Sequence, residues 1–220
     1  MPTLTSSLFA QADLDRITAA INEAESKTSG EIVPYVVDKS DAYEDAIWRA
    51  ALLFALVTLS GFVIAHQFTE AWLPDLKVIA LAVTLAAGLG LVLVNFIPAL
   101  KRLFAGNNMF DLRVYQRAAE AFIEEEVFGT RDRTGILIFL SLFERRVIVI
   151  GDNGINTKVE PSEWNEVVQR VVAGMRSGKT VDGLIDAIKQ CGLLLQQRGV
   201  ERRTDDRDEL SDRLRVGDQT

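Results

Sequence analysis

Apolar and polar residues follow two different periods in the first part of the chain. Between residues 13 and 28 the apolar residues recur three and four positions apart, which predicts an amphipathic helix. Residues 31–38 follow Gly30 and are rich in β-branched residues, which predicts a strand. Because Pro34 cannot donate a hydrogen bond to a neighbouring strand, we expect this strand to lie at a sheet edge or to contain a bulge.

The same two periods return in the second half of the chain. Residues 113–128, 162–175 and 180–195 have apolar stripes with helical spacing. Residues 135–142 and 146–151 are continuous apolar runs joined by a short polar turn, which predicts a pair of strands. An apolar run without alternation indicates burial on both faces, so we expect helices on each side of the sheet.

Two long runs between these regions contain no Asp, Glu, Lys or Arg: residues 50–69 and 78–100. A helix needs roughly 20 apolar residues to cross a bilayer, and both runs reach that length. Buried core helices are the alternative, but such helices normally keep a polar face. We therefore predict a transmembrane hairpin over residues 47–100, with spans at about 47–67 and 78–100.

The charges that flank the two spans predict their orientation. Arg49 precedes the first span, and Lys101 and Arg102 follow the second, whereas the connector 67–77 holds Lys77 as its basic residue. Positively charged residues favour the cytoplasmic side. We expect a multi-pass protein of the bacterial inner membrane whose termini and soluble domain are cytoplasmic. Glycines within the spans allow close helix packing, which favours homo-oligomerisation through the hairpin.

These elements predict one α/β domain that the hairpin divides into two segments. Residues 8–45 supply only one helix and one strand, which cannot form a domain without the elements of residues 103–198. The expected fold is an α/β/α sandwich interrupted by a two-helix transmembrane hairpin. Residues 199–220 carry charges of both signs without apolar periodicity, so we interpret them as a charged C-terminal tail.

Composition narrows the range of functions. The formal net charge of -7 argues against binding to nucleic acid. The single histidine, His66, excludes a metal site built from several histidines within the chain. The single cysteine, Cys191, lies on the apolar stripe of a predicted helix, so we expect a buried side chain rather than a nucleophile.

Charged residues frame the very apolar strand 146–151. Glu144 lies at one end and Asp152 at the other, so the two are roughly 20 Å apart if the strand is extended. Asp152 in a Gly-Asp-Asn-Gly segment offers oxygen ligands to a cation such as Ca²⁺. We take Asp152 and Asp38 as candidate metal ligands, with Glu31 and Glu144 as weaker candidates. An ordinary turn rich in glycine, aspartate and asparagine is the alternative.

The order of these elements resembles the TPM domain family, and its bacterial members with a transmembrane hairpin inside the domain are the most similar. The resemblance rests on residues 23–37, with Thr28-Ser29-Gly30-Glu31, and on residues 133–155. The segment 205–212 (DDRDELSD) also resembles a recurring tail of bacterial members. The resemblance implies an α/β/α sandwich. Some members are acid phosphatases, some bind calcium, and others assist membrane complexes.

Two functions stay open at this point. The first is a membrane-anchored accessory module that acts on a membrane protein complex and binds a divalent cation. The second is a metal-dependent phosphatase of the TPM type, for which we identify no nucleophile, metal cluster or phosphate-binding loop. The sequence assigns no catalytic residue, and it predicts the lipid bilayer and a membrane protein as partners.

Overall fold

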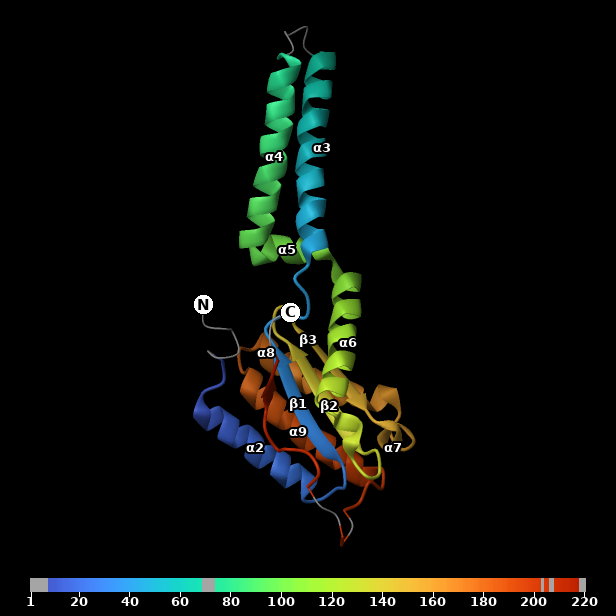
Figure 1. Ribbon diagram of the computed structural model, residues 1–220. Coiled ribbons are helices and arrows are strands. Elements are labelled where there is room, and N and C mark those ends of the chain that lie inside the picture. The colour runs from blue at the N-terminus through green and yellow to red at the C-terminus, as the bar shows by residue number, and fades with distance from the viewer. Residues whose placement is uncertain (1–7, 69–73, 203, 206–207, 218–220) are drawn as a thin grey trace. The chain divides into compact units, whose positions relative to one another are not determined.

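The computed structural model describes residues 8–68, 74–202, 204–205 and 208–217. These residues form two compact units (Figure 1). The globular unit contains the described residues up to Asp41 and from Asp111 onward, and the helical unit is Ala42–Phe110. Residues 69–73 of the predicted connector lie outside the described residues.

A mixed four-stranded sheet forms the centre of the globular unit, with the strand order β3-β2-β1-β4. The strands are β1 (Glu31–Val37), β2 (Gly135–Ser141), β3 (Arg146–Gly151) and β4 (Arg215–Val216). β1 is parallel to β2 and to β4, whereas β2 and β3 form an antiparallel hairpin. The central pair therefore joins a strand that precedes the helical unit to a strand that follows it.

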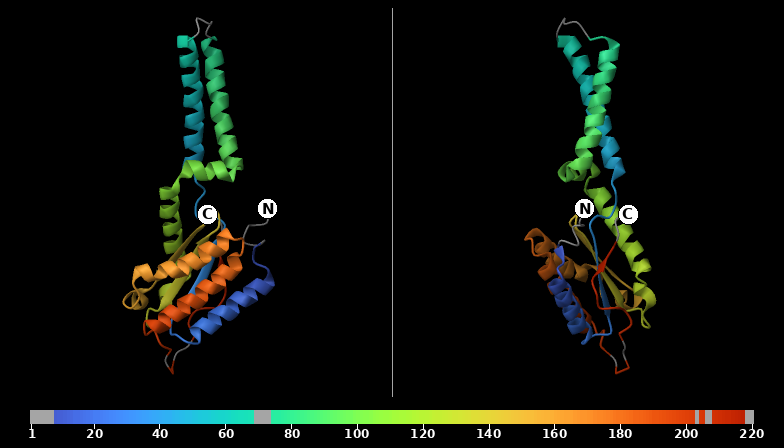
Figure 2. Two further views of the ribbon diagram at one scale, coloured as in Figure 1. Left: turned by 180° about the vertical axis from the view of Figure 1, so that it is seen from behind. Right: turned by 60° about the vertical axis from the view of Figure 1, so that its left-hand side comes forward.

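Helices cover the two faces of this sheet unequally (Figures 1 and 2). On one face, α2 (Gln11–Glu25), α8 (Trp164–Arg176) and α9 (Thr180–Gln197) bury the larger apolar cluster, and the one-turn helix α7 (Asn153–Asn156) adds Ile155. On the other face, α6 (Asn107–Glu124) packs on β1 and β2 through side chains that include Val114 and Ala118. The short 3-10 helices are Val127–Gly129 and Pro161–Glu163.

Burial confirms the sequence prediction for two strands and contradicts it for the third. Every residue of β1 and β2 is buried, as continuous apolar runs predict. In β3, by contrast, Ile148, Val149 and Ile150 are only partly buried, although the strand is equally apolar. The difference arises because β3 lies at the sheet edge, where Ile148 and Ile150 pack only partly against the apolar cluster that includes residues of α6.

The prediction that residues 31–38 form an edge strand is wrong. β1 is an internal strand, because residues of the predicted tail return to the sheet as β4 and pair with Tyr35 and Val36. β4 has two residues and does not extend to Pro34, so the proline lies beside a part of β1 that β4 leaves uncovered. A two-residue strand has too short a pattern to be recognised in a charged segment.

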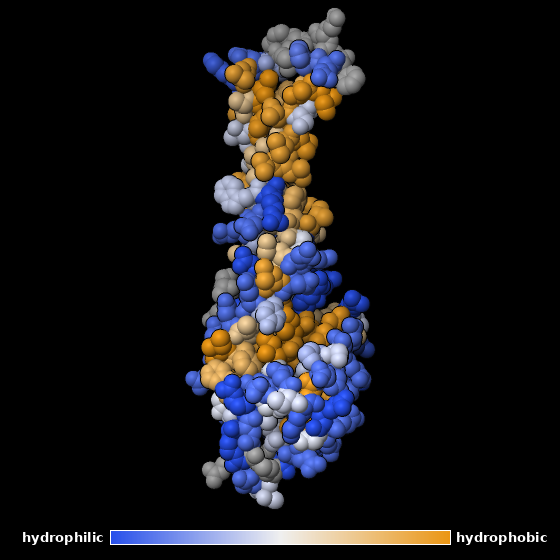
Figure 3. Space-filling model, turned by 90° about the vertical axis from the view of Figure 1, so that its right-hand side faces the viewer, coloured by the Kyte–Doolittle hydropathy of each residue, from blue (hydrophilic) through white to orange (hydrophobic). Residues whose placement is uncertain are grey.

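The helical unit consists of α3 (Glu44–Phe68), α4 (Leu76–Phe96) and α5 (Pro98–Ala105). α3 and α4 pack against each other, and a side chain at Gly90 would come within 3.0 Å of the Ala50 carbonyl oxygen, so glycine permits this close approach. Both helices are long and apolar enough to cross a membrane, and 11% of the most apolar window of each is buried. Apolar surface therefore dominates this unit (Figure 3).

Candidate metal centre

Four carboxylates from three separate parts of the globular unit meet at the amino end of β1. Glu25 is the last residue of α2, and Glu31 is the first residue of β1. Asp208 and Asp212 belong to the C-terminal segment that leads to β4. We call Glu25, Glu31, Asp208 and Asp212 the acidic quartet.

The link between α2 and β1 fixes the first two carboxylates. The hydroxyl of Thr28 donates to the Val200 carbonyl at 2.6 Å and accepts from the Gly30 amide at 3.1 Å. A side chain at Gly30 would come within 2.6 Å of Leu195 Cδ1, so any larger residue would require the Leu195 side chain on α9 to shift. This tight connection places Glu25 and Glu31 side by side although they lie on different elements.

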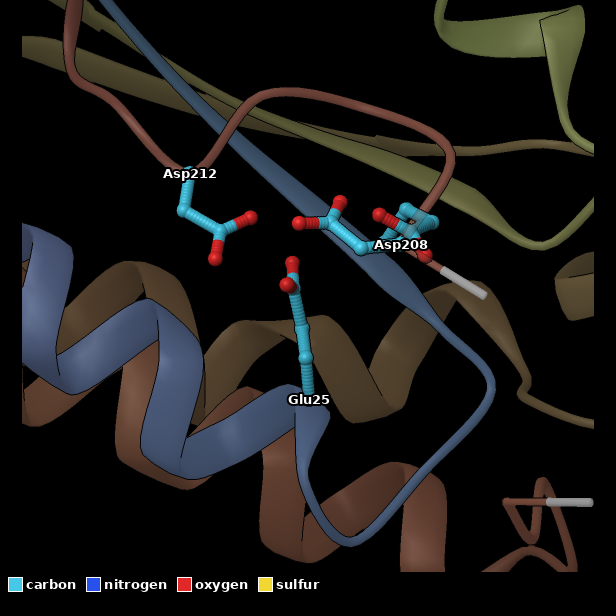
Figure 4. Close-up of side chains that lie close together, drawn as sticks. Glu25, Asp208 and Asp212 are labelled. Carbon is cyan, nitrogen blue, oxygen red and sulfur yellow. The ribbon is translucent and has the colours of Figure 1, made fainter. Parts of the chain in front are cut away.

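The C-terminal segment is held against Glu31 by its own backbone. The amides of Glu209 and Leu210 donate to the two oxygens of Glu31 at 3.4 and 3.3 Å. Further along, Arg215 forms an ion pair with Glu125 at 2.7 Å as β4 joins the sheet. These contacts carry Asp208 and Asp212 to the position opposite Glu25, where their carboxylates point toward one another (Figure 4).

The quartet surrounds a small space. One carboxylate oxygen from each residue lies within 4.8 Å of the other three. The four residues line an open pocket of about 60 Å³ together with Asn22, Ser26, Thr28 and Arg202. That volume exceeds what a single water molecule requires, so the pocket has room for an ion with associated water.

Crowding and burial make it costly to ionise all four acids. Burial, together with the nearby charges of Glu31 and Asp212, raises the pKa of Glu25 to about 9, against a 2.7 Å hydrogen bond from the Ile32 amide that lowers it. Burial, together with the charges of Asp208 and Asp212, likewise raises the pKa of Glu31 to about 7, although the hydrogen bonds from the Glu209 and Leu210 amides lower it. Burial also raises the pKa of Asp212. Like charges that share a site disfavour ionisation, whereas a bound cation reverses that preference.

The spacing of the oxygens indicates which cation fits. Ca²⁺ binds oxygen at 2.3–2.6 Å, so ligands on opposite sides of the ion are about 4.6–5.2 Å apart. The separation of up to 4.8 Å in the quartet matches this span. Mg²⁺ binds at 2.0–2.1 Å, which limits opposite ligands to about 4.2 Å. The upper limit of 4.8 Å in the quartet therefore accommodates the longer span of Ca²⁺.

The structure does not bring together the metal ligands predicted from the sequence. Asp38 follows the carboxyl end of β1, where its carbonyl accepts a hydrogen bond from Phe143 at 2.8 Å. Glu144 lies at this same end and is buried; it accepts hydrogen bonds from the Ser40 amide at 2.9 Å and from the Ser141 hydroxyl. Asp152 lies at the other end of the sheet, because β3 runs antiparallel to β2. A site that combines Asp152 with Asp38 is therefore excluded by strand direction.

Asp152 instead has a local structural role. Its Oδ1 accepts a hydrogen bond from the Asn153 amide at 2.7 Å and so caps α7, and its Oδ2 forms an ion pair with Arg133 at 2.7 Å. A side chain at Gly154 would come within 2.2 Å of the Asp132 carbonyl oxygen, so this glycine permits close contact between two loops. The Gly-Asp-Asn-Gly segment is the turn that we gave as the alternative.

One segment of the chain nearly matches the pattern of a phosphate-binding loop, although we identified no such loop in the sequence. Residues 173–180 (AGMRSGKT) differ from that pattern only in having Ala173 where the first glycine is usual. In the structure this segment connects α8 to α9, whereas a phosphate loop connects a strand to a helix. Its structural context therefore does not support nucleotide binding.

Cys191 is buried as predicted, and burial raises the pKa of its thiol.

Of the sequence candidates, Glu31 alone belongs to the quartet; Glu25, Asp208 and Asp212 were missed. No spacing rule could find them, because nearly the whole chain separates Glu31 from Asp208. A signal was nevertheless present. The segments 23–37 and 205–212, which carry part of the resemblance to TPM domains, contain all four residues.

Comparison with known proteins supports the resemblance for part of the chain. Residues 103–193 match the family model of the TPM domain. The NMR structure of BA42 protein from the psychrophilic bacterium Bizionia argentinensis is similar, with a TM-score of 0.57 and 19% sequence identity over 95% of each chain. At this identity the likeness shows the fold alone. No match is found among curated proteins. The acidic quartet lies outside the matched residues, so the chain is similar to TPM domain proteins from α5 to α9, and its candidate site rests on the geometry.

Proposed function

We propose that this protein is a membrane-anchored accessory module whose globular unit binds a divalent cation, with Ca²⁺ preferred, at the acidic quartet. The observation that carries the proposal is the convergence of four carboxylates within 4.8 Å. Glu31 contributes most to the argument, because it is 7% exposed and yet shares its surroundings with three other acids. A cation of charge +2 would offset both the burial and the repulsion that raise the pKa values of Glu25, Glu31 and Asp212.

The membrane anchor in this proposal is the pair α3 and α4. Side chains such as Leu52, Val57 and Leu81 are more than half exposed, which in water would leave a large apolar surface uncovered. A bilayer would cover that surface. Arg49 lies near the start of α3, and Lys101 and Arg102 lie on α5, which follows α4 in the chain. These basic residues favour a cytoplasmic position for the globular unit.

We place accessory action on a membrane protein complex before catalysis, because the sequence contains no recognisable nucleophile motif. The quartet offers oxygen ligands, and Arg202 is the basic residue that lines its pocket among the residues that the structure describes. An arginine beside a bound metal is what the phosphatase alternative would need in order to hold a phosphate group. We therefore keep a metal-dependent phosphatase as the second candidate, with Arg202 as the residue that would distinguish it.

Calorimetric titration of the full chain in detergent micelles with Ca²⁺ and with Mg²⁺ tests the cation site. We expect Ca²⁺ to bind more tightly than Mg²⁺ and Glu31→Gln to abolish most of the binding. Asp205→Asn is the matched control, because Asp205 is an acid of the same segment that pairs with Arg131 at 3.1 Å outside the quartet. Unchanged Ca²⁺ binding in Glu31→Gln would remove the quartet from consideration.

Thiol labelling of intact cells tests the orientation. In a Cys191→Ser background, a membrane-impermeant reagent should label Asp75→Cys in the connector and spare Asn156→Cys in α7. The reverse pattern would place the globular unit on the outer side. Crosslinking in native membranes, followed by identification of the crosslinked protein, tests the accessory role. A phosphatase assay tests the alternative: Ca²⁺-dependent hydrolysis of a phosphate ester that is lost in Arg202→Ala would favour the phosphatase.

A further inference from the structure

The two edges of the sheet are protected to different degrees. At one edge, β4 lies beside β1. At the other edge, β3 pairs with β2 and with no further strand among the described residues. Its central residues, Val147 to Ile150, include no charge and no proline. Soluble proteins usually protect an edge of this kind with a charge, a proline or a covering segment.

The hydrogen-bonding pattern shows which backbone groups of β3 are directed away from β2. The Asp152 amide donates to the Gly135 carbonyl at 2.9 Å, so this pair is a hydrogen-bonded one. Such pairs alternate along an antiparallel ladder, which places Ile150 and Ile148 in the same class. The N–H and C=O groups of Val147 and Val149 therefore point outward. No hydrogen bond of the described residues uses them.

The sheet face beside this edge is apolar and incompletely covered. Ile148 and Ile150 pack only partly against the cluster beneath α6. On α6, Leu112, Tyr115 and Ile123 are exposed by 52%, 58% and 65%. These three residues lie on one side of the helix, at spacings of three or four residues that continue through Ala119. Figure 3 looks onto this side, and apolar surface is visible among the charged residues of the globular unit.

We propose that β3 pairs with β3 of a second copy of this chain, antiparallel and about a two-fold axis at Val149. In this register Val149 lies opposite Val149 of the second copy, and Ile148 lies opposite its Ile150. Val149 of each copy then exchanges N–H and C=O hydrogen bonds with Val149 of the other, and the two four-stranded sheets become one. Val147 comes opposite Gly151, whose carbonyl also accepts a hydrogen bond from Asn156 at 2.6 Å. The incompletely covered faces meet across the axis, so that α6 of each copy covers apolar residues of both.

The charges at the two ends of β3 support this register. An interface between two identical surfaces requires each surface to be complementary to itself. In the antiparallel register Arg146 of one copy comes opposite Asp152 of the other. Within one copy, Arg146 forms an ion pair with Asp111 (2.8 Å) and Asp152 forms one with Arg133 (2.7 Å). At each end of the interface, the first ion pair of one copy therefore comes close to the second ion pair of the other copy. The charges that frame the strand thus alternate in sign across the interface.

Disulfide crosslinking of the full chain in native membranes tests the register. Opposite residues of this class have Cβ atoms about 4.5–5.5 Å apart, whereas diagonal neighbours are about 7–8 Å apart. In a Cys191→Ser background, two differently tagged copies, one with Ile148→Cys and one with Ile150→Cys, should form a mixed disulfide dimer on mild oxidation. Each variant alone should crosslink several-fold less. Efficient crosslinking of Ile148→Cys to itself would overturn the register.

Val149→Pro tests the pairing by a second route. Proline removes the outward N–H of Val149 and no hydrogen bond of the β2–β3 ladder, so the chain should fold and lose dimer at least tenfold. Ile148→Pro is the matched control, because it breaks the internal ladder and should lower Tm. Light scattering in detergent measures the mass. A monomer at every concentration would overturn the proposal, as would a dimer that persists in Val149→Pro, which would indicate contact through α3 and α4 or through α6 alone.

Discussion

The two ends of β1 each bury a carboxylate, but they do so in different surroundings. At the carboxyl end, Glu144 accepts hydrogen bonds from the Ser40 amide and the Ser141 hydroxyl. At the amino end, Glu31 accepts two longer hydrogen bonds and also faces three further acids. Burial of a charge is tolerated when hydrogen bonds compensate it. The crowding of carboxylates, rather than burial itself, therefore distinguishes the candidate cation site from a structural contact.

The largest expected difference between the two ends of β1 is in Ca²⁺ affinity. Glu31→Gln removes a charged oxygen ligand and should weaken Ca²⁺ binding by about 100-fold, or roughly 2.7 kcal/mol. Glu144→Gln leaves the quartet intact and should bind Ca²⁺ as the unchanged chain does. Calorimetric titration measures both. Equal losses in the two variants would show that the ends do not differ in the way described.

The second expected difference between the two ends of β1 is in the free energy of unfolding. Glu144→Ala leaves the Ser40 amide and the Ser141 hydroxyl without their acceptor, which should lower the free energy of unfolding by about 2 kcal/mol. Without Ca²⁺, Glu31→Gln should have the opposite sign, because it removes one of several like charges. Thermal unfolding in the presence of a chelator compares the two variants, and destabilisation by Glu31→Gln as large as that by Glu144→Ala would contradict the prediction.

The pH dependence of Ca²⁺ binding follows from the raised pKa values at the amino end. The pKa of Glu31 is about 7 and that of Glu25 about 9, so near pH 7 a cation must displace protons from the quartet. Affinity should therefore rise about tenfold per pH unit near pH 7, with proton release on binding. Titrations in buffers of different ionisation enthalpy measure the released protons. Affinity that is constant between pH 6 and 8 would contradict this assignment.

The same shifts predict the stability of the cation-free protein. A carboxyl whose pKa is raised on folding contributes stability that is present below its unfolded value near 4.5 and is lost as pH rises through the folded value. For Glu31 and Glu25 this loss extends through pH 7 and toward pH 9. The stabilisation by Ca²⁺ should accordingly be larger at pH 9 than at pH 5, as thermal unfolding at the two pH values would show.

The smallest effect concerns the exposed member of the quartet. Asp208→Asn relieves repulsion at a site that water already screens, so without Ca²⁺ it should raise Tm by about 2 °C or less. With Ca²⁺ it should lower affinity less than Glu31→Gln does. A loss of affinity that equals the loss in Glu31→Gln would mean that the exposed carboxylate contributes as much as the buried one.

Periodicity was sufficient to predict most of the fold. The apolar stripes of residues 162–175 and 180–195 became α8 and α9, and the two continuous runs after residue 135 became β2 and β3. The long uncharged runs became α3 and α4. These predictions succeed because local patterns reflect local burial. The partial exposure of β3 was not predictable, because it depends on which strand occupies the sheet edge.

The candidate site could not be predicted in the same way. The choice of Asp152 and Asp38 assumed that two strand ends would meet, but the parallel pairing of β1 with β2 separates them. The quartet depends on β4, a two-residue strand whose position is set by Leu210, Leu214 and Arg215 rather than by any repeated pattern. Long-range pairing of a short segment leaves almost no local trace in the sequence.

The pairing of β1 with β2 also constrains how the protein is made. β1 emerges from the ribosome before α3 and α4, whereas its neighbours β2 and β4 emerge after them. A buried, apolar strand must therefore wait unpaired while the helical unit is synthesised. Closing a long loop costs entropy that grows with its length, and formation of α3 and α4 shortens the flexible part of that loop. The helices that we propose as the anchor would thus also speed the completion of the sheet, and a chain in which they fail to form would expose β1 to aggregation during synthesis.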